Sequence, residues 1–188
     1  MKKVARITNE GKIKLSFSIA LFIYSAIVVL LGGAKFALPA MICSTLGDIY
    51  IMASRGVFTE RLNAKEDFSE GVFSFACAHM AYIIAMPTEK SEYCFKIALI
   101  CTVILAILKV NFKIRSSKIF CVPYAVCLIA SVLNAYEYGI LAAIGGTLFL
   151  LSDGILALFE EKDPKWQIAI WATYVPAQVC LLTAILIG

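Results

Sequence analysis

The sequence predicts an all-α integral membrane protein, a polytopic bundle of about seven transmembrane helices in a single domain over residues 1–188. Of the 188 residues, 61% are hydrophobic and 16% are charged, whereas a soluble domain is usually about 45–50% apolar and about 25% charged. The mean hydropathy is +0.87, and several apolar runs approach the roughly 20 residues that cross a bilayer. Backbone groups in hydrocarbon must hydrogen-bond within their own segment, so spans of this length are expected to be helices.

Seven apolar segments are long enough to be these spans. We place them at 13–31, 34–53, 68–86, 93–110, 119–134, 138–159 and 166–187. The first segment holds an apolar run of about 17 residues, which is longer than the roughly 7–15 residues of a signal-peptide core. We therefore favour a retained first span over a cleaved signal peptide.

The basic residues are unevenly divided between the connections. With seven spans, 14 of the 17 lysines and arginines fall in the N-terminal tail and in the second, fourth and sixth connections, and only Lys35, Lys90 and Lys96 fall on the other side. Cytoplasmic connections of membrane proteins carry an excess of basic residues. We therefore expect a cytoplasmic N-terminus. We also expect an integral, multi-pass membrane protein, located in the plasma or inner membrane if the protein is bacterial.

Two carboxylic acids, Asp48 and Asp153, lie inside the expected spans, in the segments CSTLGDIYIM and LFLLSDGILALF. A charge near the bilayer centre costs about 2.5–3.5 kcal/mol on insertion scales, and ionisable residues at such depths are functional by default. Both spans run in the same direction, and at about 1.5 Å per residue both carboxyls lie roughly 8–9 Å inside the same boundary. We predict that the two carboxyls share one site. The alternative is a structural role, in which each Asp only bonds a polar residue of a neighbouring helix.

Further polar residues are expected to line this site. Ser44 precedes Asp48 by four residues and shares its helical face, and Ser152 is adjacent to Asp153. The remaining members of the predicted cluster are His79 and Tyr82 in the third span and Tyr174 and Gln178 in the last. The alternatives for these residues are ordinary interhelical hydrogen bonds and, for the histidine, a satisfied position in the core.

The residue inventory disfavours several chemistries. Zinc hydrolases with three His ligands, or with two His and one Glu, need more than the single histidine of this chain. The chain also lacks a G-x-S-x-G nucleophile motif and a Walker A loop. We expect no metal, no cofactor and no nucleic-acid partner, with a metal held by the two Asp residues and His79 as the weaker alternative.

Four segments in order resemble the YhhN family of membrane proteins, which includes the lysoplasmalogenases. The segments are STLGDIYIM, FSFACAHMAYII, GGTLFLLSDGILAL and WATYVPAQVCLL, and the resemblance covers about residues 34–185. The family motif positions are occupied by Asp48, His79, Tyr82, Asp153, Tyr174 and Gln178. Family members typically have about eight helices and a Lys-Pro motif that opens one of them. Here a single span precedes the G-D segment and Phe36 follows Lys35, so one family helix is missing or fused.

The resemblance implies hydrolysis of the vinyl ether bond of lysoplasmalogens, which releases a fatty aldehyde and a glycerophospho-ethanolamine or -choline. A vinyl ether hydrolyses by proton transfer to carbon, and water captures the resulting oxocarbenium ion, so one acidic and one basic carboxyl suffice. Asp48 and Asp153 are the expected acid/base pair, with neither role assigned. His79, Tyr174 and Gln178 would orient water or the ether oxygen.

The expected partners are a lysophospholipid substrate and membrane lipid. Arg55 and Arg61 follow the span of Asp48, where they would meet the lipid phosphate, although an ordinary role in setting membrane orientation is the favoured interpretation. A rival function from another class is a proton- or cation-coupled transporter or a lipid-binding protein that uses the same Asp pair. A structural membrane subunit is the third alternative.

Overall fold

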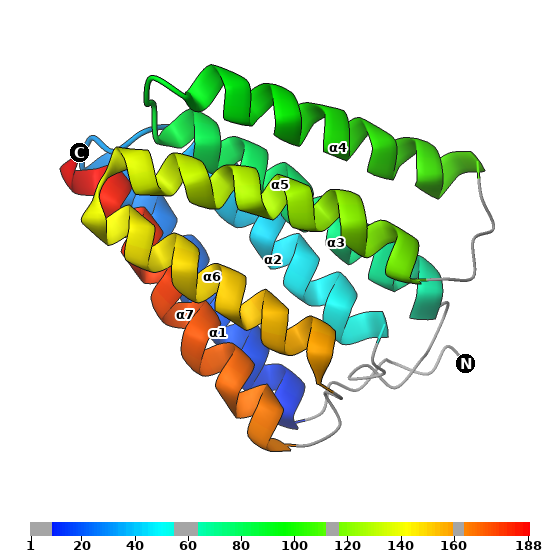
Figure 1. Ribbon diagram of the computed structural model, residues 1–188. Helices are drawn as coiled ribbons and strands as arrows, with labels where there is room; N and C mark the ends of the chain where they lie inside the picture. Colours follow the sequence, from blue (N-terminus) through cyan, green and yellow to red (C-terminus); the bar gives the residue numbers. More distant parts are fainter. Residues whose placement is uncertain (1–8, 55–63, 112–116, 160–163) are drawn as a thin grey trace.

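The computed structural model describes residues 9–54, 64–111, 117–159 and 164–188, and within these residues the chain forms seven α-helices and no strand (Figure 1). The helices are α1 (Asn9–Leu30), α2 (Ala37–Ser54), α3 (Ala64–Ala85), α4 (Ser91–Asn111), α5 (Ser117–Tyr138), α6 (Ile140–Leu158) and α7 (Pro164–Ile187). Each of them is long and apolar enough to cross a membrane. The predicted all-α bundle of seven spans is therefore confirmed.

The helices run alternately up and down, and each packs mainly against its neighbours in sequence. The most extensive contacts join α2 to α3 and α6 to α7, while α1 lies against both α2 and α7. Helix α4 lies at the edge of the bundle against α3 and α5 (Figure 1). We call the end at which α1, α3, α5 and α7 begin the N-side end. That this end faces the cytoplasm stays a prediction.

A single residue, Gly139, joins α5 to α6 at the opposite end of the bundle. Its φ of 156° lies in a region that glycine enters readily and other residues rarely adopt. This tight connection holds the two helices together there, and a Cβ added at Gly146 would lie 3.3 Å from the Cβ of Ala135. Towards the N-side end α5 and α6 diverge (Figure 1), so the two helices form a wedge that is closed at Gly139.

The buried side chains include polar groups as well as an apolar core. The larger apolar cluster contains Tyr82, Phe149 and Leu182, and a second cluster lies where α3, α4 and α5 meet. Large aliphatic side chains such as Ile100 and Leu133 cover the outer surface. An apolar exterior suits a bundle in hydrocarbon, where close packing and interhelical hydrogen bonds hold the helices together. The buried polar groups are therefore the informative part of this interior.

Two glycines of α6 offer a matched test of this packing. A Cβ at Gly145 would lie 2.9 Å from Cγ of Leu181 and 3.0 Å from the carbonyl oxygen of Ala177, whereas a Cβ at Gly154 meets nothing within 4 Å. We expect Gly145→Ala to lower the free energy of unfolding by about 1–3 kcal/mol, because the backbone of α7 must move away. Gly154→Ala should be neutral or stabilising by up to about 1 kcal/mol. Unfolding of the detergent-solubilised protein measures both, and equal effects of the two substitutions would contradict this packing.

Candidate active site

A cavity of about 260 Å³ lies among the N-side halves of the helices, and both Asp48 and Asp153 line it. The cavity wall is otherwise mostly apolar and includes Phe68, Val72, Leu128, Leu150, Leu156 and Ile170. The structure therefore places two carboxyl groups in one predominantly apolar chamber.

Asp48 accepts hydrogen bonds from two other helices. The hydroxyl of Ser18 on α1 donates to its Oδ2 at 2.7 Å, and the hydroxyl of Tyr174 on α7 donates to the same oxygen at 3.1 Å. The network continues away from the cavity, because Gln178 Nε2 donates to the Tyr174 hydroxyl at 3.1 Å and the Tyr82 hydroxyl donates to Gln178 Oε1. One continuous chain of hydrogen bonds thus links α1, α2, α7 and α3.

Asp153 belongs to a second, shorter network. The hydroxyl of Tyr124 on α5 donates to Asp153 Oδ2, and His79 Nε2 lies 3.3 Å from the same hydroxyl. Because the tyrosine proton points to the carboxyl, the tyrosine oxygen is left to accept, and we assign the proton of the imidazole to Nε2. His79 Nδ1 is then an unprotonated nitrogen, buried without a hydrogen-bond partner in the structure.

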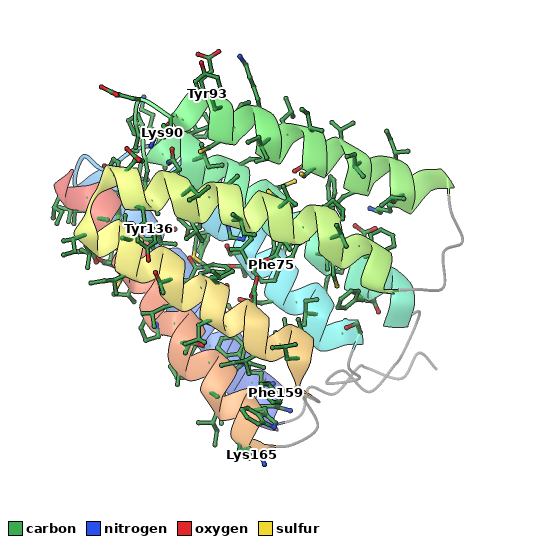
Figure 2. The ribbon with its side chains drawn as sticks, viewed as in Figure 1. Phe75, Lys90, Tyr93, Tyr136, Phe159 and Lys165 are labelled. Atoms are coloured by element: carbon green, nitrogen blue, oxygen red, sulfur yellow. The ribbon has the colours of Figure 1, made fainter. Side chains whose placement is uncertain are left out.

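An aromatic cluster separates the two networks and fixes their side chains. The ring of Phe149 makes edge contacts with His79 at a centroid distance of 4.9 Å and with Tyr174 at 5.4 Å. Phe75 packs edge-on against Phe149 and Tyr174 and points into the bundle (Figure 2). A Cβ at Gly47 would lie 2.6 Å from the Phe75 ring. The glycine beside Asp48 therefore makes room for this ring.

The predicted site residues all lie in this region, but they form two networks rather than one. His79 joins the Asp153 network, while Tyr82, Tyr174 and Gln178 join the Asp48 network.

The two predicted serines do not bond the aspartates. Ser44 is buried against Tyr82, but its Oγ makes no hydrogen bond of normal length and angle. Ser152 lines the cavity and donates to the Ile170 carbonyl oxygen at 3.3 Å. Arg55 and Arg61 lie outside the described residues. Within the described residues, no group of three or more His, Cys, Asp or Glu side chains is placed to hold a metal ion.

Three residues of the site were missed by the sequence reasoning. Ser18 and Tyr124 donate to the two carboxyls, and Lys14 lines the cavity with 7% of its surface exposed, its Nζ donating to Gln167 Oε1 at 2.6 Å. Lys14 and Ser18 are four residues apart, which places them on one helical face. This spacing was visible in the sequence, although Lys14 was counted only among the basic residues that set orientation.

The sequence profile of the YhhN family matches residues 11–185, nearly the whole chain. The chain belongs to the YhhN family. The match begins within α1, so it reaches further towards the N-terminus than the four motifs at 34–185. No curated protein and no solved structure matches this YhhN protein.

The Asp48 network predicts a specific effect on stability. Asp48→Leu removes the acceptor of the Ser18 and Tyr174 hydroxyls. The Ser18 hydroxyl also lies 3.4 Å from the Lys14 carbonyl oxygen, which can accept from it, so we expect a loss of about 1–3 kcal/mol, chiefly from the unsatisfied Tyr174 hydroxyl. Asp48→Asn retains an acceptor oxygen and should lose much less. Thermal unfolding in detergent measures both variants. The matched control is Glu92→Leu, which removes only the exposed ion pair of Glu92 with Lys96 and should cost about 0.3–0.5 kcal/mol. An Asp48→Leu protein as stable as this control would mean that the network does not hold α1 in place.

Proposed function

We propose that this YhhN protein is a membrane hydrolase that cleaves the vinyl ether bond of lysoplasmalogens, as its resemblance to the lysoplasmalogenases implies. The observation that supports the proposal is the shared cavity. Asp48 and Asp153 both line it, and each accepts a hydrogen bond from a tyrosine hydroxyl through Oδ2. These bonds to Oδ2 fix the orientation of each carboxyl. Two oriented carboxyls beside one apolar space suit acid/base chemistry on a lipid.

The reaction needs one acid, one base and one water. The acidic carboxyl gives its proton to carbon 2 of the alkenyl chain, and the positive charge develops on carbon 1 and the ether oxygen. Water adds to carbon 1 and loses a proton to the other carboxyl, which forms a hemiacetal. The hemiacetal then separates into a fatty aldehyde and a free glycerol hydroxyl, so that one water is consumed in total. A carboxylate beside carbon 1 stabilises the cation electrostatically, most strongly where water is excluded.

Lys14 extends the proposal to the polar end of the substrate. It lines the cavity four residues nearer the N-side end than Ser18, which bonds Asp48, and four helical residues rise about 6 Å along the axis. A glycerol backbone can bridge that distance. We place the lipid phosphate at the Lys14 ammonium, the vinyl ether between the carboxyls and the hydrocarbon chain along the apolar wall.

The direct test of the proposed activity is aldehyde release from a lysoplasmalogen by the purified protein in detergent. We expect Asp48→Asn and Asp153→Asn to lower the rate by about 10²–10⁴-fold each, which is the usual contribution of a general acid or base. Glu92→Gln changes an exposed carboxyl away from the cavity and should leave the rate unchanged.

Either of two results would contradict the proposal. A folded parent protein that releases no aldehyde would exclude this substrate, and in that case proton or cation flux through reconstituted vesicles would favour a transporter. Full activity in both Asp variants would exclude the carboxyl mechanism.

The head-group contact predicts a change in KM. Lys14→Met should raise the KM for a lysoplasmalogen by about 10-fold or more, because a hydrogen bond to a charged group is worth about 1.5–3 kcal/mol. For a phosphate-free 1-alkenylglycerol, the KM of the same variant should equal that of the parent protein. Lys12→Met is the matched control, since Lys12 is an exposed lysine two residues away on the same helix. An equal rise in KM for both substrates would mean that Lys14 has only a structural role.

A further inference from the structure

Some side chains of α5 and α6 that line the cavity are exposed, so the cavity reaches the outer surface between these two helices. Its lining includes Ala125 of α5 and Leu150 and Ala157 of α6, and these three side chains are also exposed on the surface. Ala125 belongs to the first half of α5, and Leu150 and Ala157 belong to the second half of α6. These are the halves of the two helices that diverge (Figure 1). The outer surface here is apolar, with Val122 67% and Leu151 51% exposed. In a membrane such a surface faces hydrocarbon, so the opening leads into the lipid phase rather than into water.

Gly154 lies at this opening, directly after Asp153, and its lack of a side chain has no packing explanation. A Cβ at Gly145 or Gly146 of the same helix would meet α7 or α5, whereas a Cβ at Gly154 meets nothing within 4 Å. Gly154 has an ordinary helical backbone, because the positive φ values in the described residues belong to Gly32 and Gly139. Glycine inside a helix costs about 1 kcal/mol relative to alanine. The absent side chain leaves the cavity open beside Asp153.

We propose that the cleft between α5 and α6 is a lateral binding site for one hydrocarbon chain of a lipid, and that Gly154 is a specificity-determining residue that keeps room for this chain beside Asp153. The identity of the lipid rests on the proposed function. The lateral site itself rests on the cavity, its exposed lining and the empty space at Gly154.

The properties of the cavity favour a single chain with a phosphate-bearing head group as the occupant. Its volume of about 260 Å³ lies just below the range of about 300–1,000 Å³ that is usual for ligand pockets, which favours one chain over two. Lys14 is the one basic residue among the described residues that line it, and it lies one helical turn nearer the N-side end than Ser18, which bonds Asp48. An anionic group at Lys14 and a chain that leaves through the wedge fit these two features together.

A fluorescence experiment tests the chain site without relying on hydrolysis. Trp171 lines the cavity and is one of the two tryptophans of the chain. In a Trp166→Phe background, Trp171 is the remaining tryptophan and reports on an occupant of the cavity. The probe is a lysophosphatidylcholine whose ester-linked chain carries a doxyl quencher. This probe has no vinyl ether, so the proposed reaction does not consume it.

We expect saturable quenching in the parent background and an apparent Kd at least tenfold weaker in Gly154→Phe. Gly154→Ala should bind as the parent does, because a methyl group still leaves space. Leu151→Phe is the matched control, since it adds an aromatic ring on the same helix at a position that does not line the cavity. It should change the Kd less than twofold. Ala125→Phe closes the opening from the α5 side and should repeat the loss if Gly154→Phe does not fold.

Two results would overturn the inference. One is unchanged binding in both Gly154→Phe and Ala125→Phe, and the other is quenching that does not saturate and is the same in every variant. A parent that releases no aldehyde, yet shows saturable quenching lost in Gly154→Phe, would contradict the proposed function while supporting the chain site. If the parent does hydrolyse lysoplasmalogens, Gly154→Leu should shift its preference towards shorter alkenyl chains.

Discussion

The hydrogen bonds to the buried carboxyl of Asp48 are the interaction on which the rest of the site depends. A carboxyl group removed from water is costly unless its oxygens find donors, and here the donors come from α1 and α7. Satisfying one residue of α2 therefore fixes the positions of two other helices, α1, which precedes it in sequence, and α7, which lies at the other end of the chain. The chain through Gln178 to Tyr82 adds α3. Four helices are thereby aligned around the cavity, and the carboxyl is oriented by the same contacts that hold the bundle.

The second constraint is the wedge formed by α5 and α6. The one-residue connection at Gly139 and the close contact at Gly146 hold these helices together at one end. Their separation at the other end exposes Asp153 to the cavity while Tyr124 still reaches it from α5. A bundle packed tightly along its whole length would bury this carboxyl without access. The glycines of α6 thus serve opposite purposes, since Gly145 and Gly146 permit contact whereas Gly154 preserves space.

The two constraints together bring different chemistries into one cavity. Lys14 lies about one turn nearer the N-side end than Ser18, the donor to Asp48, while both carboxyls line the same chamber and apolar side chains form most of the remaining wall. A lysophospholipid has the same sequence of groups, from phosphate through the glycerol oxygens to the hydrocarbon chain. Under the proposed function, this correspondence is compatible with a site that lacks a nucleophilic serine motif, because vinyl ether hydrolysis requires only proton transfer and water.

The sequence by itself determined the helices, the depth of the two carboxyls and most of the polar residues near them. Hydrophobic length and the positions of Asp48 and Asp153 along the spans are local properties, and polar residues in apolar helices are conspicuous wherever they fold. The motif positions of His79, Tyr174 and Gln178 were likewise readable. The hydrogen-bond partners of the two carboxyls could not be predicted, because they depend on how separate helices rotate and pack against each other.

Only the tertiary structure decided that Ser18 bonds Asp48, that Tyr124 bonds Asp153 and that Lys14 lines the same cavity. It also distinguished the packed Gly145 from the open Gly154, which look alike in sequence. In hydrocarbon, the hydrogen-bond donor for a buried carboxyl comes from a neighbouring helix. The space that admits a hydrocarbon chain likewise lies between helices. The sequence of one helix determines which polar side chains that helix carries, but the packing of the helices determines which groups those side chains contact.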